Sequence, residues 1–199
     1  MFGIRWRWIF IVLILLGAWK YWPMLSSHGP AGELAAGDPV QTTPRQKRIY
    51  QKGNFEFEVL ADFDIEARVL SKANYSDDRE AKLAPVDLAL GWGAMSDSAV
   101  IDQLSFSQSG RFYFYRWANE PPLPPSEIAR HSANMHLIPV NAAIEKQIKS
   151  VRAGQVVHIT GQLVEARSTE GWLWRSSLTR DDTGAGACEV IRVESISLR

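Results

Sequence analysis

Phe55-Glu56-Phe57-Glu58-Val59 begins the stretch on which the fold of this chain depends. Apolar and charged residues alternate in it, and a period of two residues is typical of a strand with one buried face. The same alternation returns over residues 63–69, where Asp, Glu and Arg occupy the even-numbered positions. The stretch therefore predicts one long strand or a bent pair of strands.

Further segments with strand character follow along the chain. Residues 111–117 (Arg-Phe-Tyr-Phe-Tyr-Arg-Trp) are the densest in aromatic side chains, which favour strands. Four prolines between Pro121 and Pro125 must end that strand, because proline has no backbone N–H to donate. Residues 155–165 alternate as well, and shorter candidate strands cover residues 135–140, 172–178 and 188–196.

Helix signals are fewer. Ser96 is placed to cap a short helix over residues 98–104, and Ser126 to cap another that ends near residue 129. The longest helix is predicted from Asn141 to Gly154, because its isoleucines recur at helical spacing. Five to seven strands with one substantial helix predict a mainly β (α+β) domain. The order of elements is that of a small OB-like β-barrel with helical inserts.

The first 23 residues predict where the protein resides. Arg5 and Arg7 precede an uncharged apolar run over residues 8–19, and Lys20 follows it. This run is shorter than the ~20 residues of a membrane span, but the flanking cations can extend to the headgroups and lengthen it. We therefore expect a retained signal anchor, a transmembrane helix over residues 1–23 with a cytoplasmic N-terminus. A cleavable signal peptide is the alternative, disfavoured by the bulky residues after the run.

Composition divides the remainder into a linker and one domain. Residues 24–49 are rich in small and turn-forming residues and predict a flexible linker. Residues 50–199 are long enough to form one domain with its own core. Six of the 22 cations and two of the 22 acidic residues precede residue 50, so this domain carries 16 cations and 20 acids, a net charge near −4. Nucleic-acid binding is not expected, because it requires clustered cations.

Cys188 is the only cysteine, so the domain cannot form an internal disulfide. It could act as a nucleophile, with His131 or His136 as the base and Asp182 orienting the base. A catalytic thiol needs an exposed sulfur near positive charge. Because Cys188 opens an apolar strand, burial as a small hydrophobic side chain is the favoured interpretation.

His131 and His136 also raise the question of a metal site. Five residues apart, the two side chains lie on opposite faces of a strand and on well-separated faces of a helix. The spacing also lacks the neighbouring ligands of known zinc motifs. We expect no metal and no cofactor.

A polar cluster between the last two predicted strands is a candidate ligand site. Its strongest members are Arg175, Ser177, Arg180 and Asp182. They could form the floor of a groove for a polar ligand such as a glycan or a peptide. The alternative, which we favour, is a rim held together by ion pairs and turns. The Gly184-Ala185-Gly186 turn lacks the lysine of a phosphate-binding loop.

The aromatic residues offer a further candidate. Trp92, between two glycines, and the aromatic run over residues 112–115 could form a stacking platform for a ligand. Consecutive aromatics on both faces of a strand are more typical of a core strand covered on both sides, and we favour that interpretation.

Several segments resemble those of one family. They are residues 85–93 (Pro-Val-Asp-Leu-Ala-Leu-Gly-Trp-Gly), 107–109, 131–136 (His-Ser-Ala-Asn-Met-His), and 174–177 through Cys188-Glu189. They are similar to a family of uncharacterised bacterial membrane-anchored proteins, over most of residues 55–196. The resemblance implies a single-pass anchor followed by a β-rich exported domain. It implies no site residues, because the family has no assigned activity.

Together these features predict a single-pass inner-membrane protein whose domain lies in the periplasm. Its expected role is binding or scaffolding at the bacterial envelope, with a membrane, envelope-protein or cell-wall partner. An envelope hydrolase or transferase that uses His131 or His136 with Cys188 and Asp182 is the first alternative. An OB-like nucleic-acid-binding domain is the second, disfavoured by the acidity of the domain.

Overall fold

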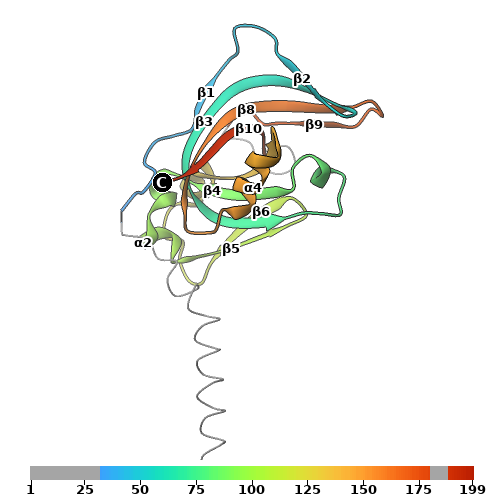
Figure 1. Cartoon of the computed structure of the whole chain (residues 1–199). Coiled ribbons are helices and arrows are strands. Elements are labelled where there is room, and N and C mark those ends of the chain that lie inside the picture. Colours follow the sequence, from blue (N-terminus) through green and yellow to red (C-terminus); the bar gives the residue numbers. More distant parts are fainter. Residues whose placement is uncertain (1–31, 180–187) are drawn as a thin grey trace, which may run out of the picture. The chain divides into compact units, whose positions relative to one another are not determined.

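The stretch that begins at Phe55 forms one strand, β3 (Phe55–Asn74), of 20 residues. The computed structural model describes residues 32–179 and 188–199 (Figure 1). Odd-numbered side chains of β3 from Phe57 to Val69 are buried, as the alternation predicts. The strand bends at an irregularity in its pairing between Val59 and Ala61. The prediction of a long, bent, half-buried strand is confirmed.

β3 pairs with two different neighbours along its length, and the change occurs at Arg68. It pairs with β8 (Val156–Ser168) along its first part and with β4 (Val86–Gly91) along its second. β4 pairs with β7 (Ser132–Pro139), which runs parallel to β10 (Glu189–Leu198), and β10 returns to β8. Hydrogen-bonded pairs thus link these five strands in a cycle, which we call the five-strand ring. A mainly β fold is confirmed.

The main hydrophobic core is formed by the inward side chains of the ring. Helix α4 (Ala142–Ser150) contributes Ile144 and Ile148 to this core, and Asn141 caps its first turn by accepting a hydrogen bond from the Ile144 N–H at 3.0 Å. At the other end of the helix, the Lys72 ammonium donates to the carbonyl of Val151 at 2.9 Å. The predicted helix and its stripe are confirmed.

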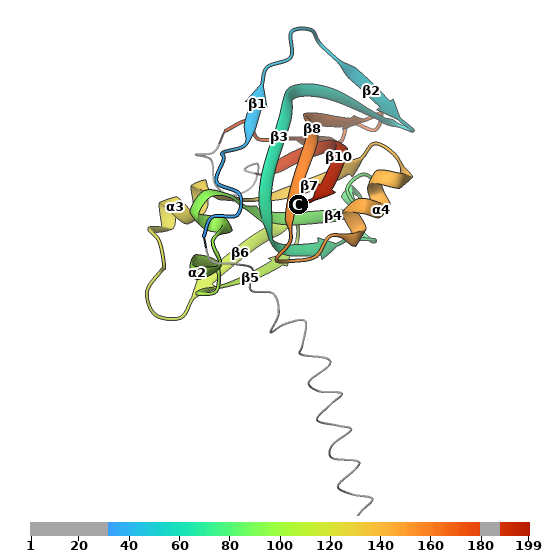
Figure 2. The same cartoon turned by 60° about the vertical axis from the view of Figure 1, so that its left-hand side comes forward.

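Beyond the ring, β3 and β8 continue into an arm, seen at the top of Figure 1. β2 (Ile49–Lys52) and β9 (Leu173–Arg175) extend this arm on its two edges. β1 (Val40–Thr42) pairs with the middle of β3 (Figure 2).

Part of the segment 32–42 packs on the domain, where the sequence predicts only a flexible linker. Ala35 is 1% exposed, and its carbonyl accepts a hydrogen bond from the N–H of Gly93 at 2.7 Å. The folded part therefore begins before residue 50. Among the described residues no helix is long and apolar enough to cross a membrane. The anchor predicted at residues 1–23 lies outside those residues.

A long insert separates β4 from β7, and a short one precedes β4. The helical and strand elements in these inserts are η1 (Glu80–Lys82), η2 (Gly93–Ser96), α2 (Ser98–Ile101), β5 (Leu104–Ser109), β6 (Phe112–Trp117) and α3 (Pro125–Arg130). α2 is shorter than predicted and is capped by Asp97 in place of Ser96. Leu104–Ser109 is a strand that the sequence analysis missed, and α3 begins before Ser126.

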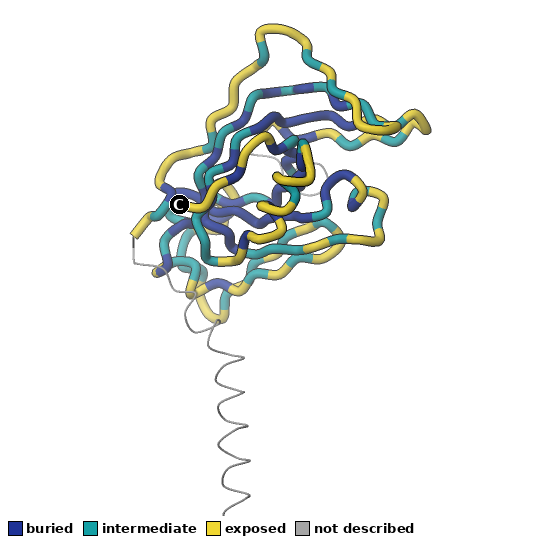
Figure 3. Tube along the Cα trace, in the orientation of Figure 1, coloured by how far each residue is buried: buried dark blue, intermediate teal, exposed yellow. Residues whose placement is uncertain are grey.

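β5 and β6 form a separate two-stranded sheet, the β5–β6 hairpin, which lies outside the ring. Its inner face packs Phe106, Tyr113 and Tyr115 against the outer side of the ring. The Tyr113 hydroxyl donates to Ser132 Oγ at 2.8 Å, which ties the hairpin to β7. On the other face, Phe114 is 47% exposed. The prediction of a core strand covered on both sides is wrong, because only one face is covered (Figure 3).

The turn of this hairpin contains an arginine whose backbone is in the left-handed conformation. Gly110 and Arg111 have φ of 57° and 70°, as a type I′ turn requires, and a side chain at positive φ is unfavourable. The Arg111 guanidinium is held by Asp87 at 2.8 Å and Asp78 at 2.6 Å, and it stacks on the Tyr75 ring at 3.7 Å. Because Asp87 is 0% exposed, these ion pairs compensate a buried charge.

We expect Arg111→Ala to destabilise the protein by about 3 to 5 kcal/mol, because it leaves the Asp87 carboxylate buried beside fewer donors. Denaturant unfolding of the detergent-solubilised full-length chain measures the effect. The matched control is Arg116→Ala, an exposed arginine on the same strand, which should change stability by less than about 0.5 kcal/mol. Equal effects of the two substitutions would show that the buried ion pairs contribute nothing.

Stability should also depend on acid pH through Asp78. The hydrogen bond from Arg111 lowers the pKa of the Asp78 carboxyl below its ordinary value. A carboxyl with a lowered folded-state pKa stabilises the fold above its unfolded pKa, and this contribution is lost as pH falls through the folded pKa. We expect stability to decline below about pH 4, and Asp78→Asn to make the decline shallower. Asp77→Asn changes an exposed neighbouring residue and should leave the pH dependence of the free energy of unfolding unchanged.

Candidate functional site

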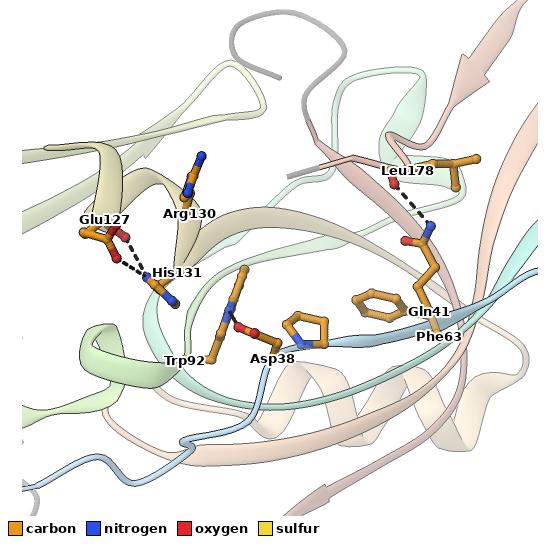
Figure 4. Close-up of a pocket in the computed structure, with 9 residues that line it drawn as sticks. Asp38, Gln41, Phe63, Trp92, Glu127, Arg130, His131 and Leu178 are labelled. Carbon is orange, nitrogen blue, oxygen red and sulfur yellow. Dashed lines mark hydrogen bonds and ion pairs between the residues drawn. The ribbon is translucent and has the colours of Figure 1, made fainter. Parts of the chain in front are cut away.

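An open cavity of about 540 Å³ among the described residues is the candidate functional site. It lies where the chain before β1 passes close to Trp92, to the end of α3 and to the residues after β9 (Figure 4). Its lining residues are Asp38, Pro39, Gln41, Phe63, Trp92, Glu127, Arg130, His131 and Leu178. Two of these, Trp92 and His131, are candidates from the sequence.

Trp92 forms part of the cavity wall, directly after β4. Its side chain is almost fully buried, and the indole N–H donates to the Asp38 carboxylate at 3.1 Å. In Figure 4 the indole lies between Asp38 and the His131 ring. Gly93 follows at φ 52°, and a Cβ there would lie 3.1 Å from the His131 ring. The glycine therefore allows the backbone to approach the histidine.

His131 has a defined hydrogen-bonding state. Its Nδ1 lies 3.0 Å from the carbonyl oxygen of Glu127 and 3.4 Å from the Glu127 carboxylate. Because both partners are oxygen acceptors, the tautomer with the proton on Nδ1 satisfies them, and in that tautomer Nε2 is an acceptor. The imidazole is partly exposed, so Nε2 can receive a hydrogen bond from a ligand.

The other lining groups mix both signs of charge with amide and apolar surface. Gln41 lies across the cavity from His131, and its amide donates to the Leu178 carbonyl at 3.2 Å (Figure 4). Asp38 and Glu127 supply carboxylates, and Arg130 supplies a guanidinium. Such a lining can both donate to and accept from a polar ligand, while Pro39 and Phe63 provide apolar contact.

His136 lies in a different place. It is a cross-strand partner of Asp87, with its Nδ1 2.9 Å from the Asp87 carboxylate, and both side chains are buried. The Trp174 ring covers it, with the two ring centroids 4.7 Å apart. His136 lies four residues, about 13 Å, along β7 from Ser132, and His131 precedes Ser132 at the end of α3. The two histidines therefore do not form one site.

Arg175 and Ser177 lie at the end of the arm and beside the start of β10. Arg175 donates to the buried Glu165 carboxylate at 2.5 Å, and two arginines together lower the pKa of that carboxyl against the effect of burial, which raises it. The Ser177 N–H donates to the Cys188 carbonyl at 3.1 Å. These contacts agree with the interpretation of this segment as a rim held together by ion pairs and turns. Arg180 and Asp182 lie outside the described residues.

Cys188 is partly exposed as a residue, and the expectation of a buried thiol stays a prediction. The Cys188 carbonyl accepts a hydrogen bond from the Ser177 N–H, and β10 begins at the next residue. The alternative that combines it with a histidine and Asp182 stays a prediction, since Asp182 is not described. Within residues 32–179 and 188–199 no three His, Cys, Asp or Glu side chains are grouped as metal ligands.

Four polar residues of the cavity were missed in the sequence analysis. Asp38 and Gln41 lie in the predicted linker, where nothing periodic marks a folded segment. Glu127 and Arg130 lie on the short helix after the prolines and reach the cavity only because α3 ends at His131. The one available signal was the Glu127–His131 spacing of four residues, which is typical of neighbours on a helix.

Comparisons with known proteins add no relative. No protein family, no curated protein and no solved structure matches this chain. The resemblance to a family of uncharacterised membrane-anchored proteins therefore stays a prediction.

Proposed function

We propose that this chain is a membrane-anchored binding module of the bacterial envelope. Residues 1–23 hold it in the inner membrane, and the folded domain lies in the periplasm. Its five-strand ring is an OB-like barrel, and its ligand occupies the cavity between Gln41 and His131. Membership in the family of uncharacterised anchored proteins is part of the same proposal.

The strand pairing supports the OB-like barrel. Five strands pair in a cycle with one parallel pair, β7 with β10, and α4 follows the third strand of the cycle along the chain. A five-stranded barrel of this kind binds ligands with its second and third strands. In this chain the β5–β6 hairpin covers the outer side of those strands, β4 and β7. The cavity beside Trp92 is open, so it is the alternative binding site to that covered face.

The observation that carries a binding role is the convergence of polar groups from separate segments on one open cavity. Gln41, Glu127 and His131 each leave an atom or a face toward it, while their other contacts fix their positions. Hydroxyl and amide groups of a ligand can form hydrogen bonds with these side chains, and the faces of its rings can contact Pro39 and Phe63. A cell-wall glycan that carries peptide amides offers these groups.

Calorimetric titration of the full-length protein in detergent with soluble muropeptides tests the ligand. We expect saturable binding, and a loss of about tenfold in affinity for Gln41→Ala, which removes one hydrogen-bonding side chain. Gln147→Ala on α4, away from the cavity, is the matched control and should bind like the unmodified protein. No heat at any muropeptide concentration, or equal loss in both variants, would refute the assignment of ligand and cavity.

Fractionation tests the anchor. The full-length chain should stay with the inner membrane after an alkaline carbonate wash, because an inserted apolar helix is not released by charge. A variant without residues 2–23 should be recovered in the soluble fraction. Recovery of the intact full-length chain from the soluble cytoplasm would refute both the anchor and the envelope role.

A further inference from the structure

The β5–β6 hairpin presents a second surface that the cavity does not use. Its outward side chains, which we call the hairpin outer face, are Ser105, Ser107, Ser109, Phe112, Phe114 and Arg116. Phe112 is 41% exposed and Phe114 47% exposed. Two neighbouring phenylalanines on one exposed face, flanked by small serines, form an apolar patch that indicates an interaction surface.

The charge of this surface differs from that of the rest of the domain. Residues 104–117 contain two arginines and no carboxylate; Arg111 is paired with Asp78 and Asp87, and Arg116 lies on the hairpin outer face. Five carboxylates instead line the outer side of the first part of β3: Glu56, Glu58, Asp62, Asp64 and Glu66. Basic side chains lie within ion-pair distance of four of them, namely Lys47, Arg48, His158 and Arg199. Figures 1 and 2 both show that part of β3 across the ring from the hairpin. A negatively charged partner would therefore meet carboxylates on that part of β3 and none on the hairpin.

The path of the chain limits where that partner can be. Gly32, the first described residue, donates its N–H to the Asp97 carboxylate at 3.1 Å. Asp97 caps α2, and β5 begins shortly after α2 ends. Phe114 pairs with Ser107, which is three residues, about 10 Å, along β5 from its start. The chain thus enters the domain beside the hairpin.

The predicted anchor ends at residue 23, so residues 24–31 connect it to Gly32. Nine residue steps span at most about 30 Å. If the anchor is in the bilayer, this tether keeps the hairpin end of the domain near the membrane surface. Aromatic side chains next to cations are the residues that settle at the boundary between headgroups and acyl chains.

We propose that the hairpin outer face rests on the anionic headgroup surface of the membrane that holds the anchor. Phe112 and Phe114 enter the boundary region, and Arg116 pairs with lipid phosphate. This proposal rests on the proposed anchor. It deepens the proposed function, because it gives the domain one orientation on the membrane in place of free rotation about a tether.

The test uses the full-length chain in lipid nanodiscs that contain anionic lipid, with one chain in each disc. In a Cys188→Ser background, a fluorescent dye is attached at Ser107→Cys on the hairpin outer face, or at Ser197→Cys on β10 as the matched exposed control. A nitroxide group on the lipid quenches a dye that is close to the bilayer. We expect quenching at least about twofold stronger at position 107 than at position 197.

Two double variants then examine the phenylalanines. Phe112→Ser with Phe114→Ser should abolish the excess quenching at position 107, because both side chains are exposed and their loss leaves the core intact. Phe112→Trp with Phe114→Trp should preserve or increase it, because tryptophan also favours the interface. Removal of anionic lipid should reduce it.

The outcomes separate this proposal from the one on which it rests. A chain that enters the discs but shows equal quenching at positions 107 and 197 would overturn the docking alone. The same holds for excess quenching that the serine variant does not change. A chain that fails to enter the discs would overturn both the anchor and the docking.

Discussion

The arrangement of this domain depends on the ion pairs of one arginine. Arg111 has a backbone conformation that side chains disfavour, and it is held there by two carboxylates, one of which, Asp87, has no exposed surface. The turn and the ion pairs require one another, since Asp87 needs a cation and only the tight turn brings Arg111 to it. Through this contact the β5–β6 hairpin is fixed across the outer side of the ring.

That placement determines which surfaces are available for function. The outer side of β4 and β7 is covered by the β5–β6 hairpin, and His136 is enclosed there between Asp87 and Trp174. The cavity beside Trp92 and the outward side of the hairpin stay open. Both arise because segments outside the ring, residues 32–42 and the insert after β4, pack against it.

The parts that were predictable have a local cause. The alternation in β3, the stripe of α4 with its Asn141 cap, and the aromatic strand β6 all follow from side-chain periodicity or capping within a few residues. Errors occurred where a partner distant in the sequence determines the outcome. Leu104–Ser109 is a strand because it pairs with the aromatic strand β6, and its own serine-rich sequence does not indicate a strand. The predicted linker contains Ala35, which is buried by residues more than 50 positions away.

The same division holds for the candidate site. The sequence alone identified a mainly β domain and two cavity residues, Trp92 and His131, because periodicity and unusual residue types are local properties. Whether His131 and His136 share a site, whether the aromatic strand is covered on both faces, and which carboxylates meet at the cavity depended on the tertiary structure. Strand register and the position of the hairpin place these groups in space, and both result from contacts between residues far apart in the chain.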